Sequence, residues 1–452
     1  MTDPNQELSF GEKVGYGLGD TATNLVWRTL MVFLPIFYTD VFGITAAAVG
    51  TLLLVVRILD GVTDFGMGLI ADRTNTRWGK FRPWVLWMAL PFGIMTVLTF
   101  TTFDLSYTAK LVYAYSTYIG LILVFTASNV PYSALTGVLS GDPVERTSVS
   151  SYRFFFAFLG GVLVQGLNIY LVAFFGQGDD VEGYKYTMMF FAGLAVILFV
   201  VTFLSTTERV KPPPRQVTSM KQDFKDLFTN KAWVVLFFIG VIFVTFTTLK
   251  QGVTLYYFKY FVGDVALAAS FMVIGTATAM ISAALTRRMS VWFGKRRLFT
   301  YSFLLGVVSS ALLYFAGPDD IAMIYILGLL MEFCTGPIVA LFFAMLGDAA
   351  DYSEWTNHRR ATGLVYSAGT LAIKFGGGIA GALTGWLLNV FGYQPNVEQS
   401  AEALEGIKLL ISVVPAVIAA LGIVALRFYP IDDELLRRIQ TELTNRKKGT
   451  PE

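Results

Sequence analysis

The stretch Thr207–Lys231, TERVKPPPRQVTSMKQDFKDLFTNK, divides the chain into two halves. Its consecutive prolines, Pro212, Pro213 and Pro214, cannot continue a helix, and such a run is typical of a semi-rigid spacer. Apolar stretches of about 20 residues, the length that crosses a hydrocarbon core of about 30 Å, lie on both sides of this linker. Six such stretches precede it and six follow it. The sequence therefore predicts an all-α membrane protein with twelve transmembrane helices in two pseudo-symmetric six-helix bundles.

The predicted spans have short polar breaks between them. In the first half they cover Val14–Tyr38, Ala46–Ala71, Pro83–Phe103, Leu111–Leu139, Val149–Phe175 and Tyr186–Ser205. In the second half they cover Ala232–Phe261, Leu267–Trp292, Leu298–Ala316, Ile321–Leu346, Thr362–Phe391 and Ile407–Phe428. The expected organisation is an N-terminal bundle at 1–206, a cytoplasmic linker at 207–231, a C-terminal bundle at 232–429 and a cytoplasmic tail at 430–452.

The composition agrees with a lipid environment and excludes several classes of function. Of 452 residues, 55% are hydrophobic and 15% are charged, whereas about 25% are charged in an average soluble domain. A net charge of +2 gives no support to a nucleic-acid partner. The single histidine, His358, and the single cysteine, Cys334, exclude a disulfide framework and a thiolate–imidazole metal cage. We therefore expect no enzyme activity and no cofactor.

The basic residues predict the orientation of the chain, because lysine and arginine stay preferentially on the cytoplasmic side of short loops. Of the 34 basic residues, 25 fall on the side that holds both termini, and five lie inside the predicted spans. The opposite side holds only Lys110, Lys185, Lys259 and Lys408, and is otherwise acidic. The polar start, MTDPNQELSFGEK, is not typical of a cleaved signal peptide. Both termini are predicted to be cytoplasmic, as in a multi-pass protein of a bacterial-type inner membrane.

The two halves also echo each other in sequence. The segment Arg77–Arg82, RWGKFR, follows the second span, and Trp292–Arg297, WFGKRR, follows the eighth. After the fourth and tenth spans, Arg146 and Arg360 lead into segments with a double and a triple glycine. Duplicated halves are typical of transporters whose binding site lies at the interface of the repeats.

A few charged residues remain inside the spans, where a charge costs about 2.5 kcal/mol or more and usually marks a cavity with a partner. Arg57, Asp60 and Asp64 are spaced so that they share one face of the second helix. Two carboxylates one turn apart repel each other unless a cation lies between them. This face predicts a site for a coupling ion, either a hard cation or a proton, with Thr63 adding a hydroxyl. The alternative is an internal ion-pair latch that binds no ion.

Other spans carry polar faces that suit a hydroxylated solute. They are formed by Asp20, Asn24 and Arg28 on the first helix, Asn129 and Tyr132 on the fourth, Arg153 on the fifth, and Thr370 and Lys374 on the eleventh. Pro131, between Asn129 and Tyr132, is expected to open the fourth helix and free carbonyl oxygens there. Amides, a guanidinium and aromatic rings provide the hydrogen bonds and apolar contacts that a sugar ring needs. Lys250 and Glu332 lie in the seventh and tenth spans, and either pair or extend separately toward the membrane surface.

Several motifs resemble one family. They are GYGLGD at 15–20, YTDVFG at 38–43, RILDGVTD at 57–64, RWGKFRP at 77–83, NVPY at 129–132 and DAADY at 348–352. In this order, from about Ser9 to about Tyr429, they are similar to the glycoside-pentoside-hexuronide:cation symporters, the melibiose-permease-like branch of the major facilitator superfamily. The chain looks closer to the xyloside and glucuronide type members than to melibiose permease.

The resemblance implies cation-coupled uptake of a sugar or glycoside, with H⁺ or Na⁺ as the coupling ion. It implies a cation near Asp60 and Asp64, with Thr126 completing the site and Lys374 close to it. It also implies that Arg153 helps to line the sugar pocket. Both neutral glycosides and anionic uronides stay open, because a uronide carboxylate would meet Arg153 or Lys374.

We expect a monomer in the lipid bilayer that works by alternating access. In this hypothesis cytoplasmic loops lock and release the outward-facing state through Arg73, Arg77, Arg146, Asp351 and Arg360. The rival hypotheses are a lipid or lysolipid cation symporter on the same scaffold, a drug/proton antiporter, and a membrane sensor that transports nothing.

Overall fold

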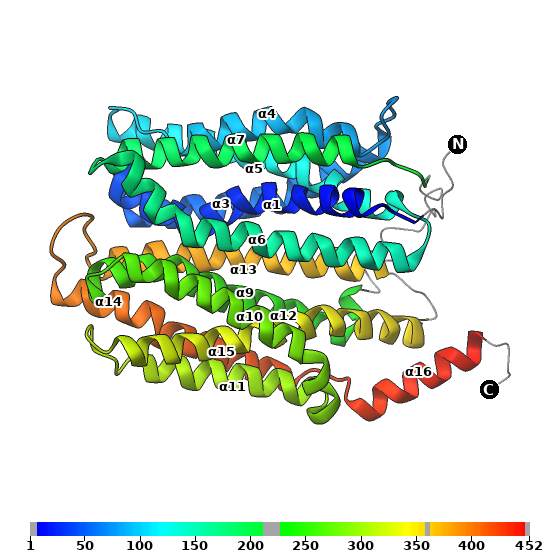
Figure 1. Ribbon diagram of the computed structural model, residues 1–452. Coiled ribbons are helices and arrows are strands. Elements are labelled where there is room, and N and C mark those ends of the chain that lie inside the picture. Colours follow the sequence, from blue (N-terminus) through cyan, green and yellow to red (C-terminus); the bar gives the residue numbers. More distant parts are fainter. Residues whose placement is uncertain (1–6, 211–226, 358–361, 448–452) are drawn as a thin grey trace. The chain divides into compact units, whose positions relative to one another are not determined.

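The structure is a computed structural model that describes residues 7–210, 227–357 and 362–447 (Figure 1). Within these ranges the regular structure is helical, and the β structure is limited to one isolated bridge between Thr76 and Gly79. The all-α prediction is therefore confirmed for the described part of the chain.

The first half of the chain forms long helices at the predicted positions. They are α1 (Phe10–Val32) with α2 (Leu34–Ile36) and the π-helical η1 (Phe37–Val41), α3 (Ala46–Arg73), α4 (Arg82–Thr99), α5 (Tyr107–Leu139), α6 (Pro143–Gly176) and α7 (Asp180–Ser205). The first span is interrupted at Pro35, in the first turn of α2, because proline lacks the N–H that would continue the hydrogen bonds of α1.

The second half repeats this pattern and adds a helix in the tail. Its elements are α9 (Lys231–Tyr256) with the π-helical η2 (Tyr257–Val262), α10 (Ala266–Phe293), α11 (Lys295–Leu313), α12 (Ile321–Asn357), α13 (Thr362–Val390), α14 (Ala401–Ile411) with α15 (Val413–Arg427), and α16 (Asp433–Lys447).

Side-chain caps explain where many of these helices begin. A side-chain oxygen before the first turn accepts a hydrogen bond from a backbone N–H that has no partner within the helix. Ser9, Thr45, Ser106, Asp179 and Asn230 do this for α1, α3, α5, α7 and α9. The short polar breaks in the sequence therefore supply the start signals as well as the loops.

Not every helix meets a strict criterion for a membrane span. Among the described residues, nine helices are long and apolar enough to cross a membrane. α1, α4 and α11 fall outside this set. α1 carries Asp20 and Arg28 in its interior, α4 begins with Arg82 and includes two prolines, and α11 begins with Lys295, Arg296 and Arg297. The count of twelve spans stays a prediction.

The chain packs as two compact units. The first consists of Met1–Pro214, Asp264–Val273 and Gly385–Ser400, and the second of Arg215–Gly263, Ile274–Thr384 and Ala401–Glu452. In the first unit α1 packs along α6 and α7, α4 packs on α5 and α7, and α3 packs on α5. In the second unit α11 packs on α12 and α15, side by side in Figure 1, and α9 packs on the same two helices.

Backbone features recur in the two halves as the sequence echoes predict. A π-helical turn followed by a left-handed glycine ends the first span of each half, at Gly43 (φ 81°) and Gly263 (φ 83°). Gly79 (φ 113°) and Gly294 (φ 76°) follow the second span of each half. These backbone angles favour glycine because a Cβ would clash there.

Three details differ from the prediction. α12 runs to Asn357, so Asp351 lies in a helix and not in a loop, and Arg146 lies within the first turns of α6. Neighbouring helices contact this extension of α12: both carboxylate oxygens of Asp348 accept hydrogen bonds from Lys295, at 2.8 and 2.7 Å, and the indole of Trp355 donates to Glu442 of α16. α5 is continuous through Pro131, which does not open the helix. The last span is instead divided at Ser412, between α14 and α15.

Candidate cation and substrate sites

The two predicted carboxylates meet a hydroxyl from a neighbouring helix. Asp60 and Asp64 lie one turn apart on α3, and Thr126 lies on α5. The Oγ1 atom of Thr126 is 3.1 Å from Oδ1 of Asp60 and 3.2 Å from Oδ1 of Asp64. Three oxygen atoms from two helices therefore converge within the first unit, as the sequence resemblance predicts.

Arg57 provides a positive charge at the same place. Its Nη1 atom is 3.5 Å from Oδ2 of Asp60, and the two side chains are 4% and 0% exposed. The guanidinium lies 4.2 Å from the ring of Trp27, its Nη2 is 3.3 Å from the sulfur of Met31, and Trp27 stacks on Phe125 at 4.6 Å. Cation–π contact of this kind stabilises a charge away from water. Arg57 therefore compensates Asp60.

Thr63 lies on the same helix but faces its own backbone. Its hydroxyl donates to the carbonyl oxygen of Asp60 at 3.1 Å. A threonine hydroxyl in a helix commonly bonds to the preceding turn, and its proton is then committed to that carbonyl. Thr63 retains only its lone pairs for a cation, so Thr126 is the better placed hydroxyl.

Asp20 and Arg153 form a second charged cluster in the first unit. The Nε atom of Arg153, on α6, donates to Oδ2 of Asp20, on α1, at 2.6 Å, and its Nη2 donates to Oγ of Ser133 at 3.1 Å. The guanidinium lies 5.2 Å from the ring of Tyr132. Arg153 therefore joins α1, α5 and α6, and three of the predicted substrate residues lie together.

Tyr132 serves mainly to join α1 to α5. Its hydroxyl donates to the carbonyl oxygen of Tyr16 at 2.6 Å, and the hydroxyl of Tyr16 lies 2.9 Å from the carbonyl oxygen of Tyr132. The two rings stack at 4.7 Å and are fully buried. The hydroxyl of Tyr132 therefore already has a hydrogen-bond acceptor, and its buried ring contacts the guanidinium of Arg153.

The double glycine on α6 explains how Asn24 and Arg28 are placed. A Cβ at Gly160 would lie 3.0 Å from Cβ of Asn24, and one at Gly161 would lie 3.1 Å from Nε of Arg28. The glycines therefore let α1 and α6 approach closely. The amide of Asn24 donates to the carbonyl oxygen of Asp20 at 2.9 Å, and Asn129 on α5 is half-buried.

The predicted residues of the eleventh span belong to the second unit. Thr370 is exposed on α13, and its hydroxyl donates to the carbonyl oxygen of Ser367 at 2.6 Å. Lys374 follows one turn later and is half-buried. Their roles beside the residues of the first unit stay predictions.

The predicted gating residues have different surroundings. Arg73 ends α3, and Arg77 lies over the ring of Trp78 at 4.7 Å in the turn before α4. Arg146 begins α6 and Asp351 lies near the end of α12, whereas Arg360 lies outside the described residues.

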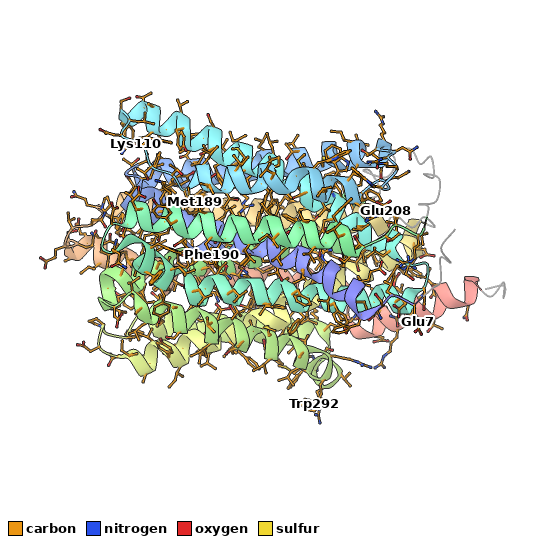
Figure 2. The ribbon with its side chains drawn as sticks, turned by 45° about the horizontal axis from the view of Figure 1, so that its top comes forward. Glu7, Lys110, Met189, Phe190, Glu208 and Trp292 are labelled. Carbon is orange, nitrogen blue, oxygen red and sulfur yellow. The ribbon has the colours of Figure 1, made fainter. Side chains whose placement is uncertain are left out.

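Glu208 is a residue that the sequence analysis missed. Its carboxylate accepts hydrogen bonds from the backbone N–H groups of Lys80, Phe81 and Arg82, at 2.9, 2.7 and 2.9 Å. It thereby caps α4, which has no side-chain cap of its own, and its charge suits the positive end of a helix. A Cβ at Gly79 would lie 2.4 Å from Cδ of Glu208. In Figure 2 Glu208 lies at one end of the first unit and Lys110 at the other.

We expect Glu208→Ala to lower the melting temperature of the purified protein by several degrees. The three N–H groups would lose their acceptor, and each unsatisfied group costs about 1–3 kcal/mol when water cannot replace it. The melting temperature is measured by size-exclusion chromatography of heated samples. Glu182→Ala is the control, because Glu182 pairs with Lys185 at 3.1 Å and its side chain is 41% exposed. Equal melting temperatures for the two variants would contradict this role of Glu208.

Comparison with known proteins identifies the family. Residues 15–433 match the model of the MFS/sugar transport proteins. The protein belongs to the glycoside-pentoside-hexuronide:cation symporters of the major facilitator superfamily. It is 38% identical over 447 residues to the putative glycoside/cation symporter YagG of Escherichia coli, covering 99% of this chain and 97% of that protein. It is 36% identical to the isoprimeverose transporter of Lactiplantibacillus pentosus, covering 94% and 89% of the two chains.

Other comparisons agree. The glucuronide carrier protein homolog of Escherichia coli is 32% identical, with 98% of this chain and 97% of that protein covered. Among solved structures, a bacterial homolog of the human lysosomal transporter Spinster superposes with a TM-score of 0.66 at 13% identity, covering 93% of this chain and 96% of the other. The nucleoside transporter NupG superposes with a TM-score of 0.60, covering 93% and 100%. These structures show the fold alone. The symporter is therefore a multi-pass membrane transporter for a sugar or glycoside, driven by a cation, and not an enzyme.

Proposed function

We propose that the coupling cation of this symporter binds between Asp60, Asp64 and Thr126. The observation that carries the proposal is the position of the Thr126 hydroxyl, 3.1 and 3.2 Å from the two carboxylates. A hydroxyl has one proton and can donate to only one of them at a time. The formal charges of Arg57, Asp60 and Asp64 sum to minus one. A monovalent cation, either Na⁺ held by oxygen atoms or H⁺ held by a carboxylate, neutralises the three residues together.

The proposed substrate is a neutral glycoside that binds beside Asp20 and Arg153. The carboxylate of Asp20 lies 2.6 Å from Arg153 and compensates its charge, so the pair presents no excess positive charge to a uronide. A charge-compensated pair still offers donors and acceptors to sugar hydroxyls. Asn24, Arg28 and Asn129 on α1 and α5, and Thr370 and Lys374 on α13, complete the proposed set, with Tyr132 as a support.

Alternating access of two six-helix bundles, with both termini in the cytoplasm, is the proposed mechanism. The bundles correspond to residues 1–206 and 232–429, joined by the linker. Cation binding relieves the repulsion between Asp60 and Asp64 and thereby organises the neighbouring sugar site, so each ligand raises the affinity for the other. Arg73, Arg77, Arg146, Asp351 and Arg360 are the proposed cytoplasmic gating residues, and the proposed working unit is the monomer.

Uptake of radiolabelled glycosides into proteoliposomes tests the function and identifies the ion. The expected result is accumulation of a neutral glycoside that depends on an imposed inward gradient of either Na⁺ or H⁺. Accumulation that does not depend on either gradient would contradict cation-coupled symport.

We expect Lys374→Ala to change the cation concentration that gives half-maximal uptake by several-fold. The family resemblance implies that Lys374 lies close to the cation site, and loss of an ammonium group there removes like-charge repulsion and so alters cation affinity. The measurement is uptake of one glycoside at varied Na⁺ and varied pH, with Lys408→Ala of α14 as the control. An unchanged cation dependence would remove Lys374 from the proposed site.

A further inference from the structure

The second unit contains a buried ion pair that the proposed transport site does not use. The Nζ atom of Lys250, on α9, lies 3.1 Å from Oε1 of Glu332 and 3.3 Å from the carbonyl oxygen of Met331, both on α12. It also lies 4.5 Å from the ring of Phe246. The side chains of Lys250 and Glu332 are 5% and 20% exposed. Of the two sequence expectations, pairing is confirmed.

The surroundings of the Lys250 ammonium group resemble those of a bound monovalent cation. A carboxylate oxygen, a backbone carbonyl oxygen and an aromatic face are groups that stabilise either an ammonium group or a small cation. A charge inside a membrane is stable only with such partners. Here the chain itself supplies the cation for the carboxylate of Glu332, as the ammonium group of Lys250.

The internal duplication places this pair at the same register as the proposed cation site. Pro131 lies inside α5, and Pro337 lies inside α12, the corresponding fourth helix of the second half. Thr126 comes five residues before Pro131, and Glu332 comes five residues before Pro337. Glu332 therefore occupies in the second half the position that Thr126 occupies in the first.

The second helix of each half extends the correspondence. Asp60 comes 19 residues before Gly79, and Gly275 comes 19 residues before Gly294. By the same count, Ala279 corresponds to Asp64. The packing agrees, because a Cβ at Gly275 would lie 3.0 Å from Cγ of Glu332, just as Asp60 contacts Thr126 in the first unit. In the second half the carboxylate has moved from the second helix to the fourth, and a glycine leaves room for it.

We propose that the ammonium group of Lys250 is a tethered cation, which occupies in the second unit the place that the exchangeable coupling cation takes in the first. The second site is then permanently filled, and only the first binds and releases an ion during transport. This proposal rests on the proposed function, because the correspondence between the two halves is drawn from Asp60 and Thr126 of the first site. The ligand class for an emptied second site is a monovalent cation, either Na⁺ or an alkylammonium ion.

The test empties the second site in a protein whose first site is disabled. Lys250→Ala removes three methylene groups and the ammonium group, which together correspond to n-propylammonium. In the double variant Asp64→Asn/Lys250→Ala, we expect NaCl or n-propylammonium chloride to raise the melting temperature by about 5 °C over choline chloride at equal ionic strength, with saturation. Asp64→Asn alone is expected to gain nothing from either cation. The addition of Glu332→Gln is expected to abolish the gain.

Lys295→Ala is the matched control in the Asp64→Asn background, because Lys295 pairs with Asp348 at 2.7 Å but is 32% exposed. Its loss is expected to create no saturable cation effect. The proposal would be overturned if the Lys250→Ala protein folds but its melting temperature does not change with either cation. A cation effect that persists in Asp64→Asn alone would instead overturn the proposed first site, so the two failures are distinguishable.

The same salts serve if Lys250→Ala proves unstable. Recovery of a monodisperse protein in NaCl or n-propylammonium chloride, but not in choline chloride, supports the tethered cation. If Lys250→Ala is not recovered as a monodisperse protein in any of the three salts, the proposal is overturned, whether or not the double variant Lys250→Ala/Glu332→Gln folds. If the double variant folds, no free cation can replace the ammonium group of the lysine. If it does not fold, the protein requires the packing of the Lys250 side chain rather than its charge.

Discussion

Asp64→Asn is expected to abolish accumulation of the glycoside, so that the ratio of internal to external substrate falls to about one, while exchange of substrate down its gradient continues. Arg57, Asp60 and Asp64 together carry a formal charge of minus one, and Arg57 lies 3.5 Å from Asp60. We expect the coupling cation to balance the charge of this group. The amide removes that charge but keeps the size of the side chain. The three residues then sum to zero charge, and cation binding gains nothing from neutralisation.

The measurements for Asp64→Asn are gradient-driven uptake and substrate counterflow in proteoliposomes. Glu182→Gln is the matched control, since it makes the same chemical change at a carboxylate that is 41% exposed. Accumulation by Asp64→Asn equal to that of the wild type would refute the proposed cation site. Asp60→Asn is less informative, because it leaves Arg57 buried without its carboxylate and such a change commonly destabilises a protein.

The sequence predicts the helices and part of the candidate cation site for identifiable physical reasons. Long apolar stretches with polar breaks require helices in lipid, because every backbone group must be satisfied within the segment. The spacing of Asp60 and Asp64 places both on one helical face, and their common partner Thr126 is found where the family resemblance expects it. Local periodicity therefore predicts the helices and the shared face of Asp60 and Asp64, whereas Thr126 is implied by the family resemblance alone.

Contacts between distant residues explain most of what the sequence analysis did not predict. Glu208 caps backbone groups about 127 residues earlier in the chain, and nothing in its own surroundings indicates this. The stacking of Trp27 on Arg57 and the hydrogen bond from Arg153 to Ser133 likewise depend on helix packing. The acidic segment with Asp351 has the composition of a loop, yet it is helical, and its Asp348 pairs with Lys295 of another helix at 2.7 Å.

Single signals in the sequence also mislead where two local outcomes compete. A proline inside a helix suggests an opening at Pro131, but α5 is continuous there. Packing on the neighbouring helix stabilises this part of α5, since Tyr16 of α1 stacks on Tyr132. Thr63 sits beside Asp64 in sequence, but its hydroxyl bonds to the carbonyl oxygen of Asp60. In both cases, the local backbone hydrogen bonds and the packing of one helix on the next decide the outcome.

Asp20→Asn is expected to shift the preference of the symporter from a neutral glycoside toward a uronide by about ten-fold or more, which corresponds to about 1.4 kcal/mol. The variant keeps the position of Arg153 through Ser133 at 3.1 Å but removes the carboxylate that compensates the guanidinium. The uncompensated charge then favours a substrate carboxylate. We expect a higher KM for a neutral aryl xyloside and a lower one for the matching aryl glucuronide.

The control for Asp20→Asn is Glu12→Gln. Glu12 also pairs with an arginine, Arg209, through two hydrogen bonds of 2.6 and 2.8 Å, and it lies outside the proposed substrate site. Its loss is expected to lower stability without changing the ratio of the two KM values. The double variant Asp20→Asn/Arg153→Gln separates charge from structure, because residues in direct contact couple by about 0.5–3 kcal/mol and the glucuronide preference requires Arg153. A preference for the glucuronide that survives in the double variant would refute the assignment of Arg153, and an unchanged preference in Asp20→Asn would refute the role of the pair in excluding uronides.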